Sequence, residues 1–421
     1  ETNELVTTIK DLNVVGHAQT KAGVLAFGAG AKVALENVDI QNCGTVGVQV
    51  NSATVTAENL KTSGNAWGGV NLDVGSGQTS APDFTLSGDD CDLQEANAIY
   101  SECKDNNVEA SIMVTATGFT AVVIEGDPAE VRYTTDVGSL VEVLNAAAGD
   151  STQISVDDFV ADVDGTWYTD FDTALAAVTT GSTITLLQNV TVNDKIVIDD
   201  ANVTLDGDGH SITVSTNADF VGPNQTPPVN SVLEVLANNV TIQGVKLIGT
   251  DGKTKHGVQF YNVEDGKLSG VTVTDTAWTG VLVNASEVTI ENSVLNPTGD
   301  GVYATIEYAM GNDTLTRIPT LHLNNVSSDS GITVWADNAT VTRVNTRSAE
   351  ADTAAEAAEE IRNSITTENN VAITVSIDVN NDDDNPVDTT VPSTKPSNGS
   401  SGVTRYNITI EDMENGDVTS S

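Results

Sequence analysis

The chain has 421 residues, of which 60 are acidic and 17 basic, and its formal net charge is -43. This charge argues against nucleic acid and anionic membrane as partners, because both are bound through clustered lysine and arginine. No apolar run reaches the roughly 18 residues that a spanning helix needs, so we expect no membrane insertion. Aromatic residues make up only 4%, and the abundance of Val, Thr, Asn, Asp and Gly is typical of strands and turns.

Short strands recur through the first part of the chain, and every second one opens with glycine. The glycine-led segments Gly23-Val-Leu-Ala-Phe, Gly47-Val-Gln-Val and Gly69-Val-Asn-Leu are spaced by 24 and 22 residues. One such repeat cannot bury its own apolar row, whereas stacked repeats pair each strand with its copies above and below. Without two-residue Asn-Gly links, parallel stacking is favoured over hairpins. We therefore predict a first β-helical segment over residues 1–135.

The same pattern returns over residues 182–347, which we predict to be a second β-helical segment. Its glycines Gly257, Gly280, Gly301 and Gly331 are spaced by 23, 21 and 30 residues, and each is expected to open a strand. The fold class expected is all-β, a right-handed parallel β-helix in two stacked or adjoining segments with short capping helices. An array of β-sandwiches is the alternative. Six residues are expected to point into the second core: Val240, Ile242, Val271, Val273, Val288 and Ile290.

Three further regions break the repeat. Residues 136–181 are predicted to be a helix-containing junction, with one helix over Val137–Ala147 and another that begins at capping Asp170. Residues 348–379 are predicted to hold a capping helix and a strand. Residues 380–402 are rich in Pro, Ser, Thr and Asn and are expected to form a flexible linker to a C-terminal strand and tail over 403–421.

Two motifs carry a family resemblance. The run Asp164-Gly-Thr-Trp-Tyr-Thr-Asp-Phe-Asp, followed by Gly181-Ser-Thr-Ile-Thr-Leu-Leu and Asn202-Val-Thr-Leu-Asp-Gly-Asp-Gly, resembles pectate-lyase-like β-helices on prokaryotic cell surfaces. The resemblance covers about residues 164–345 and implies the fold and a surface location rather than an activity. The run Tyr406-Asn-Ile-Thr-Ile-Glu-Asp-Met resembles the first strand of a small repeat in Gram-positive surface proteins.

The chain offers few residues for catalysis. Pectate lyases of this fold use calcium on clustered Asp residues together with an Arg or Lys base, and no basic residue of the second segment aligns with an acidic ladder. We therefore predict no catalytic residue and no cofactor. One acidic loop, with Asp206 and Asp208, has the glycines and oxygen ligands of a candidate calcium site. The alternative is a tight turn whose Asp side chains accept backbone hydrogen bonds.

Two classes of side chain bear on the compartment. Candidate glycosylation sequons, which turn asparagines before Val-Thr strands also generate for structural reasons, include Asn189, Asn202, Asn239, Asn284, Asn325 and Asn338. Cys43 is expected to be a buried apolar residue, and Cys91 and Cys103 are expected to pair only in an oxidising compartment. The start at Glu1 without methionine is typical of a processed terminus or a chosen boundary. We expect a secreted, extracellular or cell-surface protein.

The C-terminal strand supplies the functional hypothesis. Tyr406, Ile408 and Ile410 alternate with polar residues, and one strand cannot satisfy its own backbone groups. The linker reaches roughly 70 Å if extended. We predict docking on a neighbouring subunit, so that a structural or adhesive protein forms a homo-polymer or binds a cell-envelope partner. Docking on its own chain and a free tail are the alternatives. The competing function is a secreted β-helix that binds or cleaves glycans, with Trp67, Trp278 and Trp335 beside a groove, although packing is the simpler expectation for each.

Overall fold

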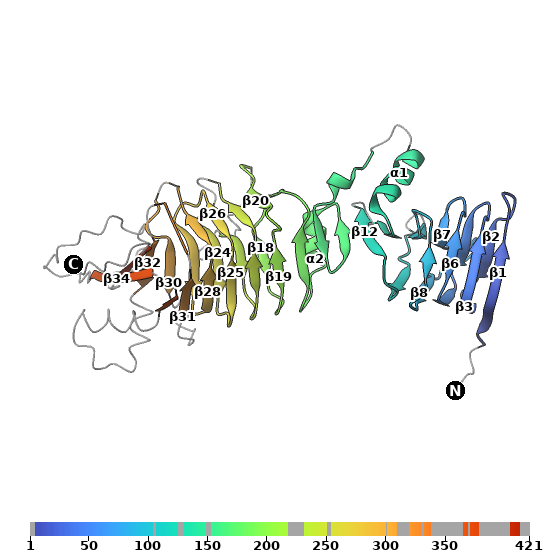
Figure 1. Ribbon diagram of the computed structural model, residues 1–421, viewed down its shortest axis with the longest axis horizontal. Helices are drawn as coiled ribbons and strands as arrows, with labels where there is room; N and C mark the ends of the chain where they lie inside the picture. The colour runs from blue at the N-terminus through green and yellow to red at the C-terminus, as the bar shows by residue number, and fades with distance from the viewer. Residues whose placement is uncertain are drawn as a thin grey trace. The chain divides into compact units, whose positions relative to one another are not determined.

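The computed structural model describes residues 5–103, 107–124, 130–148, 153–217, 231–250, 254–299, 301–309, 320–324, 326–329, 332–337, 365–368, 371–378 and 405–412. It forms two compact units, Glu1–Ala176 and Ala177–Ser421. Both are built from coils of a parallel β-solenoid, in which each coil contributes strand segments that pair with the coils before and after it (Figure 1). The expected fold class is confirmed.

The first unit stacks its coils through parallel pairs only, from β1 to β11. The first two coils each join two faces in one bent strand, because β3 pairs with β5 before its bend and with β6 after it. The strands in coil order are β1 (Thr7–Val15) and β2 (Ala22–Phe27); β3 (Lys32–Gln41) and β4 (Val46–Asn51); β5 (Thr54–Glu58), β6 (Lys61–Ser63) and β7 (Gly68–Asp73); β8 (Asp83–Ser87), β9 (Asp92–Leu93) and β10 (Ile99–Ser101); and β11 (Ser111–Val114).

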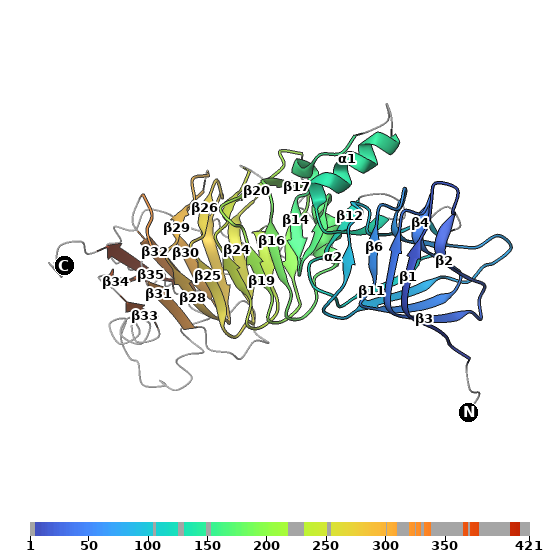
Figure 2. The same ribbon diagram turned by 45° about the vertical axis from the view of Figure 1, so that its right-hand side comes forward.

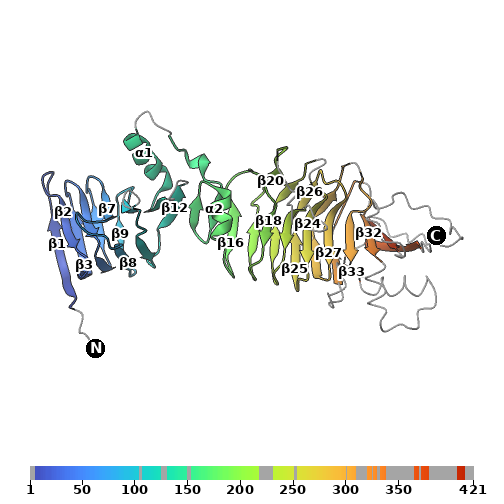
Figure 3. The same ribbon diagram turned by 180° about the vertical axis from the view of Figure 1, so that it is seen from behind.

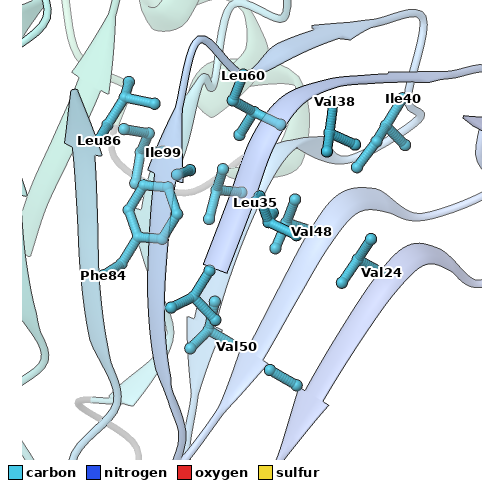
Figure 4. Packing of buried hydrophobic residues seen from close by; sticks show 14 of the residues in the cluster. Val24, Leu35, Val38, Ile40, Val48, Val50, Leu60, Phe84, Leu86 and Ile99 are labelled. Carbon is cyan, nitrogen blue, oxygen red and sulfur yellow. The ribbon is translucent and has the colours of Figure 1, made fainter. Parts of the chain in front are cut away.

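The core of this unit is a stack of small and branched side chains. Phe84, Leu35 and Ile40 are fully buried and point into the space enclosed by the strands (Figure 4). Along the stacking direction, like residues lie over one another, as in the register that aligns Leu35 with Ala57 and then Leu86. Burial of such ladders supplies the driving force that a single coil lacks.

The end of the first unit differs from the expectation. Parallel stacking was expected throughout residues 1–135, but β12 (Thr120–Ile124) and β13 (Glu130–Thr134) form an antiparallel hairpin, and β13 is also antiparallel to β10. A connection of five residues, 125–129, is long enough for a hairpin but far too short for a parallel crossover. The parallel segment of this unit therefore ends at β11.

The predicted junction helices are confirmed as α1 (Val137–Ala148) and α2 (Phe171–Ala176). Asp136 accepts hydrogen bonds from the amides of Gly138 and Ser139 at the start of α1, and Asp170 accepts one from Thr173 at 2.6 Å. These carboxylates satisfy donors that a helix start leaves open. The remaining elements of the unit are a 3-10 turn (Val156–Asp158) and the antiparallel pair β14 (Ala161–Val163) and β15 (Thr166–Tyr168), with β15 parallel to β12.

The second unit has three strands per coil, and these build three parallel faces (Figures 2 and 3). All six residues expected to point inward are fully buried. One face holds β16 (Thr183–Leu186), β19 (Thr204–Asp206), β22 (Thr241–Gln243), β25 (Gly266–Ser269), β28 (Glu287–Glu291), β31 (Thr320–Asn324) and β33 (Ile365–Glu368). The next holds β17 (Val190–Val192), β20 (Ser211–Val214), β23 (Lys246–Ile248), β26 (Thr272–Thr274) and β29 (Val294–Asn296). The third holds β18 (Ile196–Ile198), β21 (Ser231–Val235), β24 (His256–Tyr261), β27 (Thr279–Asn284), β30 (Ile306–Ala309) and β32 (Ile332–Asp337).

One expected strand is out of register. Gly301 was predicted to open a strand as Gly257 and Gly280 do, but β30 begins at Ile306, and the residue hydrogen-bonded to Gly280 is Thr305. Gly301 instead has φ of 117°, a conformation that side chains rarely adopt, so its role is in the preceding turn. Gly331, the predicted helix Ala349–Ile361 and the linker 380–402 lie outside the described residues.

Candidate functional site

The C-terminal strand is present, and it lies on the last coils of its own chain. β35 (Arg405–Asp412) runs antiparallel to β32 on one side and to β34 (Val371–Asp378) on the other. β35 lies between β32 and β34, which do not pair with each other. The register places Tyr406, Ile408 and Ile410 opposite Ala336, Val334 and Ile332 of β32, and opposite Ile377, Val375 and Ile373 of β34. Three arrangements were considered for this strand: docking on a neighbouring subunit, docking on its own chain and a free tail. In the single chain, the strand docks on its own chain.

The acidic loop forms a tight turn. The Oδ1 atom of Asp206 accepts a hydrogen bond from the amide of Asp208 at 2.9 Å, and its Oδ2 atom accepts one from Gln243 Nε2 at 2.7 Å. Asp208 is exposed and has φ of 45°, and Gly209 follows with φ of 84°. Both carboxylate oxygens of Asp206 therefore have partners within the chain, as the turn alternative requires. This geometry adds no further ligand for a calcium ion at the loop.

The candidate glycosylation sites are not equivalent. Asn189, Asn202 and Asn239 are exposed at turns, and Asn239 Nδ2 donates to Asn202 Oδ1 at 3.1 Å, so the last two form one rung of a ladder between adjacent coils. Asn284 is buried, with 7% of its surface exposed, and a glycan there would have to displace packed neighbours. Asn325 and Asn338 lie outside the described residues. Glycosylation stays a prediction for the exposed sites.

The three cysteines are not paired with one another. Cys43 is buried in the first core, as expected, and Cys103 is also buried, whereas Cys91 is partly exposed. Burial raises the pKa of all three thiols above the usual value, so the thiolate form is disfavoured. These are the properties of inert packed cysteines rather than of nucleophiles.

A cluster that sequence reasoning missed surrounds Trp278, which precedes β27. The ammonium group of Lys255 lies 4.0 Å from the centre of the indole ring, His256 meets the ring edge-on at 5.7 Å and Tyr303 lies at 6.1 Å. His256 Nδ1 is 2.6 Å from Thr279 Oγ1, and the Tyr303 hydroxyl donates to Glu307. Because these polar atoms bond to one another, the cluster stabilises the corner between successive coils. Packing of Trp278 was the simpler expectation and is confirmed.

Trp67 occupies the corresponding place in the first unit, immediately before β7, but its surface is 59% exposed. The expectation that it packs is wrong, because its coil carries no counterparts of Lys255, His256 and Tyr303. Polar residues lie near its backbone: Asn97 Nδ2 donates to the Trp67 carbonyl oxygen at 3.4 Å, and Arg132 Nη1 donates to Asn97 Oδ1 at 3.0 Å. The side chain of Trp335 is outside the description.

A polar row follows the same face of the first unit and was also missed. Gln49, Asn71 and Tyr100 lie in register on β4, β7 and β10. Asn71 accepts a hydrogen bond from Gln49 and donates one to Glu102 at 3.0 Å, while the Arg132 guanidinium lies 5.3 Å from the centre of the Tyr100 ring. Burial raises the pKa of the Tyr100 phenol well above its usual value. The alternation of side chains along each strand could have shown that these three residues face outward, but not that Asn71 and Tyr100 become buried.

The described residues contain no group of three or more His, Cys, Asp or Glu side chains placed to share a metal ion. Within the same residues, no helix combines the length and the apolar character needed to span a bilayer. Comparison of the chain with protein-family models, with curated proteins and with solved structures finds no match.

Proposed function

We propose that this chain is an extracellular structural protein of the cell surface that assembles by strand exchange, each copy supplying β35 to a neighbour. The observation that carries the proposal is the position of β35, which is inserted between β32 and β34 although the sequence places it after both. The strand that fills this position can come from any copy of the chain, because every copy offers β32 and β34 as partners in the same register.

The connection between β34 and β35 permits both arrangements. Residues 379–404 separate the two strands and are rich in Pro, Ser, Thr and Asn. At about 3.1 Å per residue an extended segment of this length spans roughly 80 Å, far more than a return to the adjacent strand needs. Exchange keeps every backbone pair of β35 and changes only which copy provides it. Repeated in one direction, exchange generates a linear polymer.

Paired cysteines can tell the two arrangements apart. Thr333 and Thr409 are register partners on β32 and β35. In a Cys91→Ser background, we would mix one chain that carries Thr333→Cys with another that carries Thr409→Cys, oxidise the mixture, and separate the products without reductant. Strand exchange predicts a disulfide-linked pair of chains, whose yield rises with concentration. The double variant Thr333→Cys/Thr409→Cys shows whether the register itself is correct.

Two controls complete the experiment. Thr409→Cys mixed with Met113→Cys, on β11 of the first unit, should give no specific product. A chain that lacks residues 405–421 should no longer form linear polymers, as judged by size-exclusion chromatography or electron microscopy. If the double variant closes only within one chain and the mixture gives no cross-linked pair at any concentration, β35 is self-docked and the proposed assembly is wrong.

One observation favours a second candidate, glycan binding by the first unit. Trp67 exposes 59% of its surface on a unit whose same face carries amide, carboxylate and guanidinium groups, and exposed aromatic residues with such neighbours suit sugar rings. Binding of a polysaccharide panel that is lost in Trp67→Ala and kept in Trp278→Ala would support this candidate. Equal binding by wild type and Trp67→Ala would remove it.

A further inference from the structure

No described residue covers the outer side of the first coil of the first solenoid. Among the described residues, β1 is hydrogen-bonded on one side only, to β3, and β2 on one side only, to β4. Both strands lie at the outer end of the first unit (Figure 1). Leu12 lies over Val38 in the register, yet Leu12 is 44% exposed where Val38 is 1% exposed. An open edge with exposed core positions is the surface on which another strand adds.

This end is nearly neutral in a strongly acidic chain. Residues 5–31 include one acidic residue, Asp11, and two basic residues, Lys10 and Lys21, whereas the whole chain has a net charge of -43. Exposed apolar side chains lie there instead: Leu5, Val6, Leu12, Val15, Leu25 and Phe27. Two copies would repel each other over most of their surface, but they can approach through this end without that repulsion.

We propose that two copies of this chain stack end to end through their first coils, related by a twofold axis. The carrying observation is that the sequence of β1 and the residue before it is self-complementary when read against itself in the antiparallel direction. About a centre between Lys10 and Asp11, four of the five opposite pairs match in chemistry: Lys10 faces Asp11, Ile9 faces Leu12, Thr8 faces Asn13 and Val6 faces Val15. The fifth pair, Thr7 and Val14, matches in shape only.

The side-chain directions agree with this pairing. Asp11 has φ of 50° and marks the bend of β1, so the inward positions switch from odd to even numbers there. Ile9 and Leu12 lie in register with the buried residues Leu35 and Val38, and Lys10 and Asn13 with Glu36 and Asp39. Inward residues thus meet inward residues across the axis. A register shifted by one residue would place inward-facing residues of one copy opposite outward-facing residues of the other.

The third side of the coil fits the same axis. The twofold axis that passes through the bend of β1 crosses the opposite side of the coil near the middle of β2. There, Leu25 meets Leu25 of the second copy, and Val24 meets Ala26, both of which are inward and buried in the single chain. β1 and β2 therefore each gain a second partner strand at once, and the exposed part of the core is covered.

The test uses a cysteine at the axis. Leu25 is 59% exposed, so Leu25→Cys in a Cys91→Ser background should form a disulfide-linked dimer under mild oxidation. Met113→Cys, at a position 58% exposed on β11, is the matched control and should form no disulfide-linked dimer. Equal cross-linking of the two variants, or none in either, would overturn the proposal.

A charge at the edge supplies an independent readout. Val15 is 66% exposed and faces outward, so Val15→Lys should leave the coil folded while placing a solvated ammonium between the strands. In sedimentation velocity the wild type should associate through this interface whether or not exchange of β35 also links copies, and this variant should weaken the dissociation constant of the end-to-end dimer at least tenfold, or about 1.4 kcal/mol. Leu236→Lys in the second unit should leave dimerisation unchanged. A wild type that is monomeric from about 1 to 100 µM contradicts the proposal. Exchange of β35 shares no residue with this interface, so either can fail alone.

Discussion

Asn37 donates a hydrogen bond from its side-chain amide to the carboxylate of Asp11 at 2.9 Å, and both residues have a left-handed backbone, with φ of 52° and 50°. Asn59 continues the ladder by donating to Asn37 at 3.1 Å, with φ of 54°. Each of these residues forms the same corner of its coil. The corner requires a left-handed conformation, which Asn and Asp tolerate, and hydrogen bonds between successive coils satisfy their polar side chains.

Replacement of Asn37 should separate these two contributions. Asn37→Ala loses both the conformational tolerance and the hydrogen bonds, and we expect it to lower the free energy of unfolding of the first unit by about 1–3 kcal/mol. Asn37→Gly keeps the conformation and should cost about 1 kcal/mol less. Chemical denaturation followed by circular dichroism measures both. Equal losses in the two variants would show that the backbone conformation contributes little.

Gly47 tests why glycine recurs at the start of the third side of each coil. A Cβ atom there would lie 2.8 Å from the carbonyl oxygen of Gly69 and 3.0 Å from Thr62 Cγ2, which leaves no room between coils. Gly47→Ala should therefore cost about 1–3 kcal/mol in unfolding free energy. Gly30→Ala is the control, since no heavy atom lies within 4 Å of its added Cβ, and it should change stability by less than about 0.5 kcal/mol.

Glu291 gives the second unit a pH dependence. Hydrogen bonds from Lys267, at 2.8 Å, and from Ser269 lower the pKa of this carboxyl below its usual value. A depressed pKa in the folded state means that the contribution is present above the unfolded value of about 4.5 and is lost as the pH falls through the folded value. The pair is largely solvent-screened, so we expect less than about 1 kcal/mol. Thermal unfolding at pH 7 and pH 3 should show a smaller difference for Glu291→Gln than for wild type, and identical differences would contradict this assignment.

Calcium removal tests the loop at Asp206. Since both oxygens of this carboxylate bond within the chain, we expect the same melting temperature in calcium and in EDTA. A melting temperature that falls in EDTA for the wild type, but not for Asp208→Asn, would restore the calcium site.

The thiols should react in order of exposure. A thiol reagent at neutral pH should modify Cys91 in the folded protein and should reach Cys43 and Cys103 only after denaturation, because burial hinders access and raises the pKa of both thiols. Cys91→Ser should abolish the reaction of the folded chain. Rapid labelling of a second thiol in that variant would contradict the packing described for the first core.

The repeated strands were predictable from the sequence because burial dictates them: residues such as Val240 and Ile290 recur at inward positions with a period that only stacked coils explain. The strand register at Gly301 was not predictable, since a turn glycine and a strand-opening glycine look alike without the neighbouring coil. The hairpin of β12 and β13 was missed because its apolar run fits either direction of pairing. The cluster at Trp278 joins residues more than 20 positions apart, and no local pattern marks such contacts.

The number of strand pairs that each coil shares with the next determines how the first unit responds to force. Hydrogen bonds between coils run along the stacking direction. Tension in that direction is therefore shared by all the bonds of one interface, whereas every interface in the stack carries the same total force. Beyond the fourth coil, β8 and β11 share four register pairs and β10 and β13 share two. The third and fourth coils share ten register pairs, five of them between β5 and β8, and the second and third coils share thirteen. Among the described residues, the interface beyond the fourth coil is therefore the one that yields first, and a pulled first unit would part there while its first four coils stay together.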